Sequence, residues 1–170
     1  YLMDYQAGRI FSDPLLPGVP PAERAPLYDA MNDALARLHG FDWAGGGLAD
    51  YGRPSQYFAR QVARWSKQYQ ASETEKIEAM DNLIAWLPAN VPPGDETRIV
   101  HGDYRIDNVI FDPVEPRIGA VIDWELCTLG DTLADVGYIM NNWAEAGEAG
   151  PSQAVAMPTS TGGFPTRAEF

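Results

Sequence analysis

His101-Gly102-Asp103-Tyr104-Arg105-Ile106-Asp107-Asn108 is the most informative stretch of this 170-residue chain, and Asp123-Trp124-Glu125 begins fifteen residues after it ends. Short β-type runs flank the first segment, over residues 98–101 and 109–111, and a third run covers residues 118–122. Two X-Pro pairs, at residues 112–113 and 115–116, punctuate the chain between the second and third runs. These runs predict a small β-hairpin whose ends carry the two polar segments.

The polar side chains are expected where these strands begin and end. Asp103 follows a strand in a loop with Gly102, Asn108 begins the next strand, and Asp123 ends the third. The hairpin would bring Asn108 and Asp123 side by side. Two oxygen ligands without His or Cys suit Mg²⁺, which completes its shell with water and ligand phosphates. Asp103 would lie nearby as a proton acceptor, and a carboxylate base beside Mg²⁺ is what phosphoryl transfer needs.

The remainder of the chain has mostly helical patterns. Apolar residues recur three or four positions apart over residues 23–39, 55–69, 77–87 and 131–143. Ser72 and Glu75 have the spacing of a capping box and are expected to begin the third helix, and Asp131 is expected to cap the fourth. Residues 147–163, rich in Gly, Pro, Ser and Thr, are expected to form a mobile loop. The pattern as a whole predicts an α+β fold.

Charge and composition narrow the class of partner. The formal net charge is −12, from 24 acidic and 12 basic side chains. Such a surface repels phosphate backbones, so neither nucleic acid nor an anionic membrane is expected as a partner. No apolar run approaches the roughly 20 residues of a membrane span. The single cysteine, Cys127, suits a reducing cytoplasm, so we expect a cytoplasmic protein with a small-molecule partner.

The segment His101-Gly-Asp-x-x-x-x-Asn108, followed by Ile122-Asp123-Trp124-Glu125, resembles the catalytic and metal loops of the aminoglycoside phosphotransferase family, small-molecule relatives of the protein kinases. The sequences of residues 8–11 and 123–131 are similar to those of the family branch whose kinase-like domains occur alone or fused to acyl-CoA dehydrogenases. The resemblance implies the C-terminal lobe of a kinase-like fold over residues 6–170, incomplete at its C-terminus. This lobe would be mostly helical, with a small β-hairpin bearing the catalytic and metal loops.

Residues 1–5 look like the hinge strand that joins such a lobe to an N-terminal lobe. Nothing before Tyr1 supplies the family's glycine-rich loop, its strand Lys or the helix Glu that pairs with it. We expect the N-terminal lobe to precede this chain in the natural protein. Biological loss of that lobe, or its supply by another chain, are the alternatives.

The resemblance also implies roles for individual residues. Asp103 would be the catalytic base, Asn108 a metal ligand, and Asp123 the principal Mg²⁺ ligand that bridges the nucleotide phosphates. The backbone of the hinge residues Met3 and Asp4 would hydrogen-bond the adenine of ATP.

Four further residues are expected to support the site. His101 would orient the catalytic loop through side-chain hydrogen bonds, and Asp135 would brace the same loop from its helix. Arg105 could contact substrate or phosphate, or lie in solvent. Glu125 could assist the metal through a water molecule, or make a structural hydrogen bond.

Structural roles are expected for four other residues. Asp107 should be exposed, and His39 should interact with the carbonyls or the dipole at its helix end. Trp124 and Trp143 should be core residues rather than stacking platforms for substrate.

The expected function is an ATP- and Mg²⁺-dependent phosphotransferase acting on a hydroxyl of a small molecule. Hydroxylated acyl compounds and amino sugars are the acceptor classes that the resemblance implies. A catalytically silent nucleotide- or partner-binding module and a metal-dependent phosphohydrolase are the alternatives.

Overall fold

The computed structural model describes residues 4–94, 96–141, 143–145, 157–158 and 162–170. Asp4 and Tyr5 are exposed and outside any strand, while the first three residues of the expected hinge fall outside the described residues. Most of the loop expected over residues 147–163 also lies outside them. The helices and strands, in chain order, are α1 (Pro21–His39), α2 (Tyr57–Ser72), α3 (Glu78–Trp86), β1 (Arg98–Val100), β2 (Val109–Phe111), β3 (Ile118–Val121), β4 (Thr128–Gly130), α4 (Leu133–Asn141), β5 (Trp143–Ala144) and β6 (Met157–Pro158).

The predicted hairpin is present. β2 and β3 pair antiparallel, with Val109 opposite Val121 and Ile110 opposite Ala120, and the register shifts at Phe111. The connecting turn is held by the Asp112 carboxylate, which accepts two backbone N–H groups of the turn at 2.9 and 3.1 Å. Since the two strands are separated by a short loop, their pairing could be predicted from local sequence alone.

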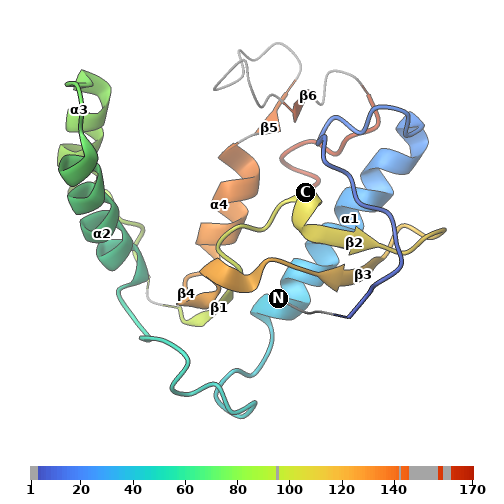
Figure 1. Ribbon diagram of the computed structural model, residues 1–170, viewed down its shortest axis with the longest axis horizontal. Helices are drawn as coiled ribbons and strands as arrows, with labels where there is room; N and C mark the ends of the chain where they lie inside the picture. The colour runs from blue at the N-terminus through green and yellow to red at the C-terminus, as the bar shows by residue number, and fades with distance from the viewer. Residues whose placement is uncertain (1–3, 95, 142, 146–156, 159–161) are drawn as a thin grey trace.

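The sequence patterns did not predict β4. This strand pairs antiparallel with β1, with Val100 opposite Thr128 and Arg98 opposite Gly130. The described residues thus form three two-stranded sheets, and the third joins β5 to β6 in parallel. The β1–β4 pair brings the start of the Asp103 segment next to the chain that follows Asp123 (Figure 1).

A hydrophobic core unites α1, the hairpin and α4. The apolar face of α1 is buried through Leu27, Met31 and Leu35, which are 1–2% exposed. They belong to one buried cluster with side chains from β2, the Asp103 loop and α4. Burying each such side chain stabilises the fold by roughly 1.5–3 kcal/mol. α1 therefore holds the hairpin and α4 as one body, on which the candidate site is built (Figure 1).

α2 and α3 stand to one side of this body (Figure 1). Every residue of these two helices is described, and none is buried. The expected capping box is wrong, because Ser72 is the last residue of α2. Its hydroxyl donates back to the Gln68 carbonyl at 3.0 Å, a bond that Ser makes readily within a helix. Ile77 precedes α3 and makes no side-chain capping bond.

Candidate active site

The loop after β1 turns sharply at Gly102. This residue has φ +85°, and a Cβ there would lie 2.7 Å from the Leu126 carbonyl oxygen. Glycine is required both by the left-handed backbone and by this close approach. The turn leads the chain from the buried His101 to the half-buried Asp103.

Asp103 and Asn108 are held together directly. The side-chain amide of Asn108 donates to the Asp103 backbone carbonyl at 2.8 Å and to its carboxylate Oδ2 at 3.0 Å. A short 3₁₀ turn over Ile106–Asn108 brings the amide back to the start of the loop. Asn108 is 7% exposed, so its orientation is set by its surroundings. Because its nitrogen faces Asp103, its amide oxygen is left available to another partner.

His101 connects this loop to the end of β3. Its Nδ1 accepts the Asp103 backbone N–H at 3.3 Å, and its Nε2 lies 2.9 Å from the Ile122 carbonyl oxygen. Because a carbonyl only accepts, the network assigns the neutral tautomer with the proton on Nε2. The imidazole thereby orients the loop, as expected, and also ties it to the residue that precedes Asp123.

Asp123 follows directly at the end of the hairpin. The Ile122 N–H donates to the Asn108 carbonyl at 2.9 Å, so the backbone beside Asp123 is bonded to Asn108 itself. Asp123 is exposed and has φ +65°, in the left-handed region that Asp adopts more readily than most residues. Such backbone conformations concentrate at functional sites. The hydrogen bonds of His101 and Ile122 thus hold the loop with Asp103 and Asn108 next to the backbone beside Asp123, which lies fifteen residues after Asn108.

Asp135 braces the Asp103 loop from α4. Its carboxylate is fully buried and accepts the His101 N–H at Oδ2 and the Gly102 N–H at Oδ1, each at 2.8 Å. His39 was expected to act at its own helix end. Its Nε2 instead lies 3.0 Å from Asp135 Oδ2, and the two residues are 96 positions apart. Fold topology places a buried carboxylate there, which a helix-end pattern could not predict.

Arg105 and Tyr138 both interact with the Asp103 side chain. The Arg105 Nε lies 3.9 Å from the Asp103 Oδ1, and its guanidinium pairs with Asp107. Burial raises the pKa of the Tyr138 phenol, and its side-chain interaction with Asp103 raises that pKa further. Asp107 was expected to be exposed, but it is only partly so and forms this ion pair. The sequence analysis missed Tyr138, although its position three residues after Asp135 puts both on neighbouring turns of α4.

The structure also places one of the two expected hinge residues, Glu125 and the two tryptophans. Asp4 is exposed, Met3 lies outside the described residues, and Glu125 is exposed in the 3₁₀ turn Trp124–Leu126. The core assignment of Trp124 is wrong: the side chain is 41% exposed. Its ring packs 4.8 Å from the His101 ring and its Nε1 donates to the Val121 carbonyl, so it covers the loop from outside. Trp143 is in the core, as expected.

The donors at this site fit Mg²⁺. Among the described residues no group of three or more His, Cys, Asp or Glu side chains could hold a metal ion. The described residues therefore do not form a metal site in which such side chains supply every ligand. An amide oxygen and an exposed carboxylate on neighbouring backbone segments match the usual Mg²⁺ arrangement, in which water and phosphate complete the shell.

This hairpin, with its paired Asp and Asn loops on a helical body, defines the C-terminal lobe of a kinase-like phosphotransferase fold. Residues 1–169 match the model of the phosphotransferase enzyme family named APH, and the chain belongs to this family. No helix of the described residues is long and apolar enough to cross a membrane.

Relatives and solved structures agree with this assignment. The chain is 49% identical to acyl-CoA dehydrogenase family member 10 of Mus musculus and 51% identical to family member 11 of Gallus gallus, over 81% of its length. It spans only 13% and 18% of those proteins. A solved structure from Ralstonia eutropha, provisionally named an aminoglycoside phosphotransferase, is 46% identical with a TM-score of 0.88. That match covers 98% of this chain and 51% of the Ralstonia chain.

A more distant structure shares the fold alone. The aminoglycoside phosphotransferase APH(4)-Ia, solved in a ternary complex with ADP and hygromycin B, is 18% identical with a TM-score of 0.54. It covers 72% of this chain, and this chain covers 45% of it.

Proposed function

We propose that the protein transfers the γ-phosphoryl group of ATP, with Mg²⁺, to a hydroxyl group of a small molecule. The observation that carries the proposal is the hydrogen-bonded arrangement of Asp103, Asn108 and the backbone beside Asp123. Membership of the phosphotransferase family supports the same reaction class. A bond forms between the acceptor oxygen and the γ-phosphorus, the bond from that phosphorus to the bridging oxygen of ADP breaks, and the hydroxyl proton passes to a carboxylate.

Asp103 is the carboxylate proposed to receive that proton. A carboxylate is a weak base toward an alcohol, so the proton moves late and orientation of the hydroxyl contributes most. The bond from Asn108 to Oδ2 holds the carboxylate in one orientation. His101 and Asp135 act behind it by holding the loop backbone. The rigid loop therefore supports a positioning role for Asp103.

Asn108 and Asp123 are proposed to hold the metal through their side-chain oxygens. When bound, Mg²⁺ would neutralise charge that develops on the transferred phosphoryl group. Asp4, an exposed residue, and Met3 before it are proposed to contact adenine through their backbone. The ADP complex of APH(4)-Ia supports a nucleotide in this fold. The single cysteine, Cys127, supports a reducing compartment such as the cytoplasm.

The test measures ADP formation by the intact natural protein with Mg-ATP and a panel of hydroxylated acids, amino sugars and choline. Turnover with one acceptor class, lost in Asp103→Asn, is the expected result. Absence of turnover with every acceptor, together with ATP affinity unchanged in Asp123→Ala, would instead support a silent binding module. Phosphate release that needs neither ATP nor an acceptor would identify a phosphohydrolase.

A further inference from the structure

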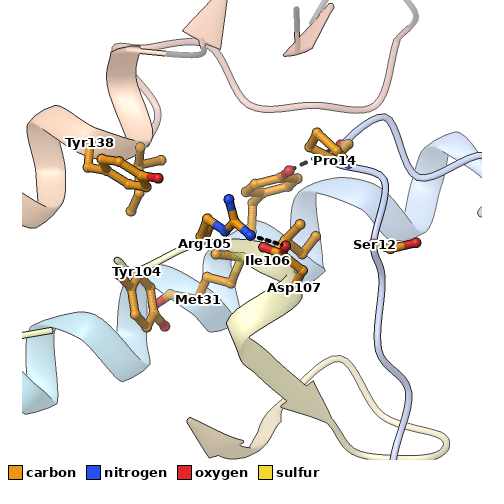
Figure 2. A pocket seen from close by; sticks show the side chains of 10 residues that line it. Ser12, Pro14, Met31, Tyr104, Arg105, Ile106, Asp107 and Tyr138 are labelled. Carbon is orange, nitrogen blue, oxygen red and sulfur yellow. Dashed lines mark hydrogen bonds and ion pairs between the residues drawn. The ribbon is translucent and has the colours of Figure 1, made fainter. Parts of the chain in front are cut away.

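A cavity of about 160 Å³ lies beside the Asp103 loop, between α1, α4 and the 3₁₀ turn Ile106–Asn108. Buried apolar side chains of Met31, Ile106 and Ile139 form much of its wall. Arg105 and Tyr138 line its polar side (Figure 2). These last two are also the side chains that interact with Asp103. The cavity therefore adjoins the proposed catalytic carboxylate.

The charges that line the cavity are already neutralised. Arg105 and Asp107 form an ion pair with each other, as the dashed contact in Figure 2 shows. Asp107 carries the one carboxylate among the described lining residues, and Arg105 already pairs with it, so an ammonium group deep in the cavity would find no free partner. Asp103 lies outside this lining, 3.9 Å from the Arg105 Nε. Desolvating such an ion costs several kcal/mol unless a partner compensates it. The lining thus favours an uncharged guest over a polycationic amino sugar.

The size of the cavity limits the guest as well. An apolar protein cavity of about 150 Å³ is large enough to hold benzene. A cavity of about 160 Å³ with a mostly apolar wall accordingly suits a compact hydrocarbon group of about six carbon atoms.

We propose that this cavity binds the uncharged, apolar part of the acceptor alcohol, with its hydroxyl directed past Arg105 and Tyr138 toward Asp103. The inference rests on the proposed function, because it needs an acceptor for Asp103. It adds the substrate class: a compact apolar alcohol rather than an amino sugar. Tyr138, on the rim of the cavity, is then a residue that determines specificity.

The direct test uses cyclohexanol and trans-4-aminocyclohexanol as probes, which differ by one ammonium group. Binding is followed through the methyl NMR signals of Met31 and Ile139 in the intact protein. The expected result is a saturable shift with cyclohexanol and at least about tenfold weaker binding of the amine, which equals about 1.4 kcal/mol. Equal affinity for the two probes, or no saturable shift with cyclohexanol, would overturn the proposal.

Two variants and a matched control locate the binding. Ile139→Phe fills the cavity and should weaken cyclohexanol binding about tenfold, with the Met31 signal as the reporter. Leu35→Phe enlarges another buried four-carbon side chain, away from the cavity, and should leave that affinity unchanged. Should Ile139→Phe fail to fold, Tyr138→Ala removes a half-exposed wall residue and should also weaken binding. Retention of wild-type affinity in the cavity variants would refute the site.

The two proposals can fail separately. Saturable binding of cyclohexanol in the cavity of the wild type, without phosphoryl transfer to any acceptor, would reject only the proposed function. Conversely, an acceptor that is phosphorylated with the same KM in wild type and Tyr138→Ala would reject only the cavity proposal. The joint expectation is a raised acceptor KM and an unchanged ATP KM in Tyr138→Ala.

Discussion

Removing the Asp135 carboxylate should release the loop that carries Asp103. In Asp135→Ala, the N–H groups of His101 and Gly102 lose acceptors that lie 2.8 Å away, and His39 loses its partner. Each buried donor left without an acceptor costs about 1–3 kcal/mol. The two N–H groups together cost about 2–6 kcal/mol, which is a large share of the roughly 5–15 kcal/mol that stabilises a typical domain.

A milder variant keeps the shape of the side chain. Asp135→Asn retains one acceptor oxygen but turns an NH₂ group toward a backbone donor, and should cost about 2 kcal/mol. The matched control is Asp131→Asn, two residues before the start of the same helix, α4. Asp131 accepts the Leu133 N–H at 3.0 Å as a helix cap, and Asn caps helices equally well, so the expected change is below about 0.5 kcal/mol.

Urea unfolding measures the free energy of unfolding of Asp135→Asn and of Asp131→Asn. Native-state hydrogen exchange reports how well the backbone amides of the loop are protected. At least one of the His101 and Gly102 amides should exchange faster in Asp135→Asn than in Asp131→Asn, because only the first change replaces one of the two acceptor oxygens by an NH₂ group. Equal stability of the two variants, with equal protection of both amides, would refute the anchoring role of Asp135.

Three further predictions test the site. First, Asp103→Asn should lower turnover by about 10²–10⁴ while nucleotide affinity stays nearly intact. Asp123→Ala should instead abolish Mg²⁺-dependent nucleotide binding, measured by calorimetry. Equal behaviour of the two variants would contradict their separate roles. Asp103→Asn should also lower the raised pKa of Tyr138 toward its usual value of 10.0 in an ultraviolet titration, since it removes the nearby carboxylate, and an unchanged titration would place the two groups apart. Gly102→Ala should lower the melting temperature more than Gly162→Ala. Both residues have positive φ, but only a Cβ at Gly102 meets a backbone carbonyl, at 2.7 Å. An equal fall in melting temperature in the two variants would show that the Asp103 loop shifts to accommodate the added methyl group.

Local sequence was sufficient for the elements whose partners lie close in the chain. The apolar spacing of α1 and the pairing of β2 with β3 both follow from short-range patterns, and both were predicted. The hairpin in turn places Ile122 against Asn108, so the backbone proximity of the Asn108 and Asp123 segments was also foreseeable. Within these segments, side-chain period and turn chemistry determine the outcome.

Tertiary structure decided the rest, because those contacts join residues that no local pattern relates. His39 meets Asp135 across 96 residues. Asp135 meets His101 across 34 residues, a contact that the family resemblance led us to expect but that no local pattern contains. The exposure of Trp124 and the cavity beside Asp103 likewise depend on how α1, α4 and the loops pack together. Sequence alone determined which polar groups this protein carries at its strand ends. Only the packed fold, which excludes water and sets each donor against an acceptor, decided which of those groups are held rigid and what kind of molecule fits beside them.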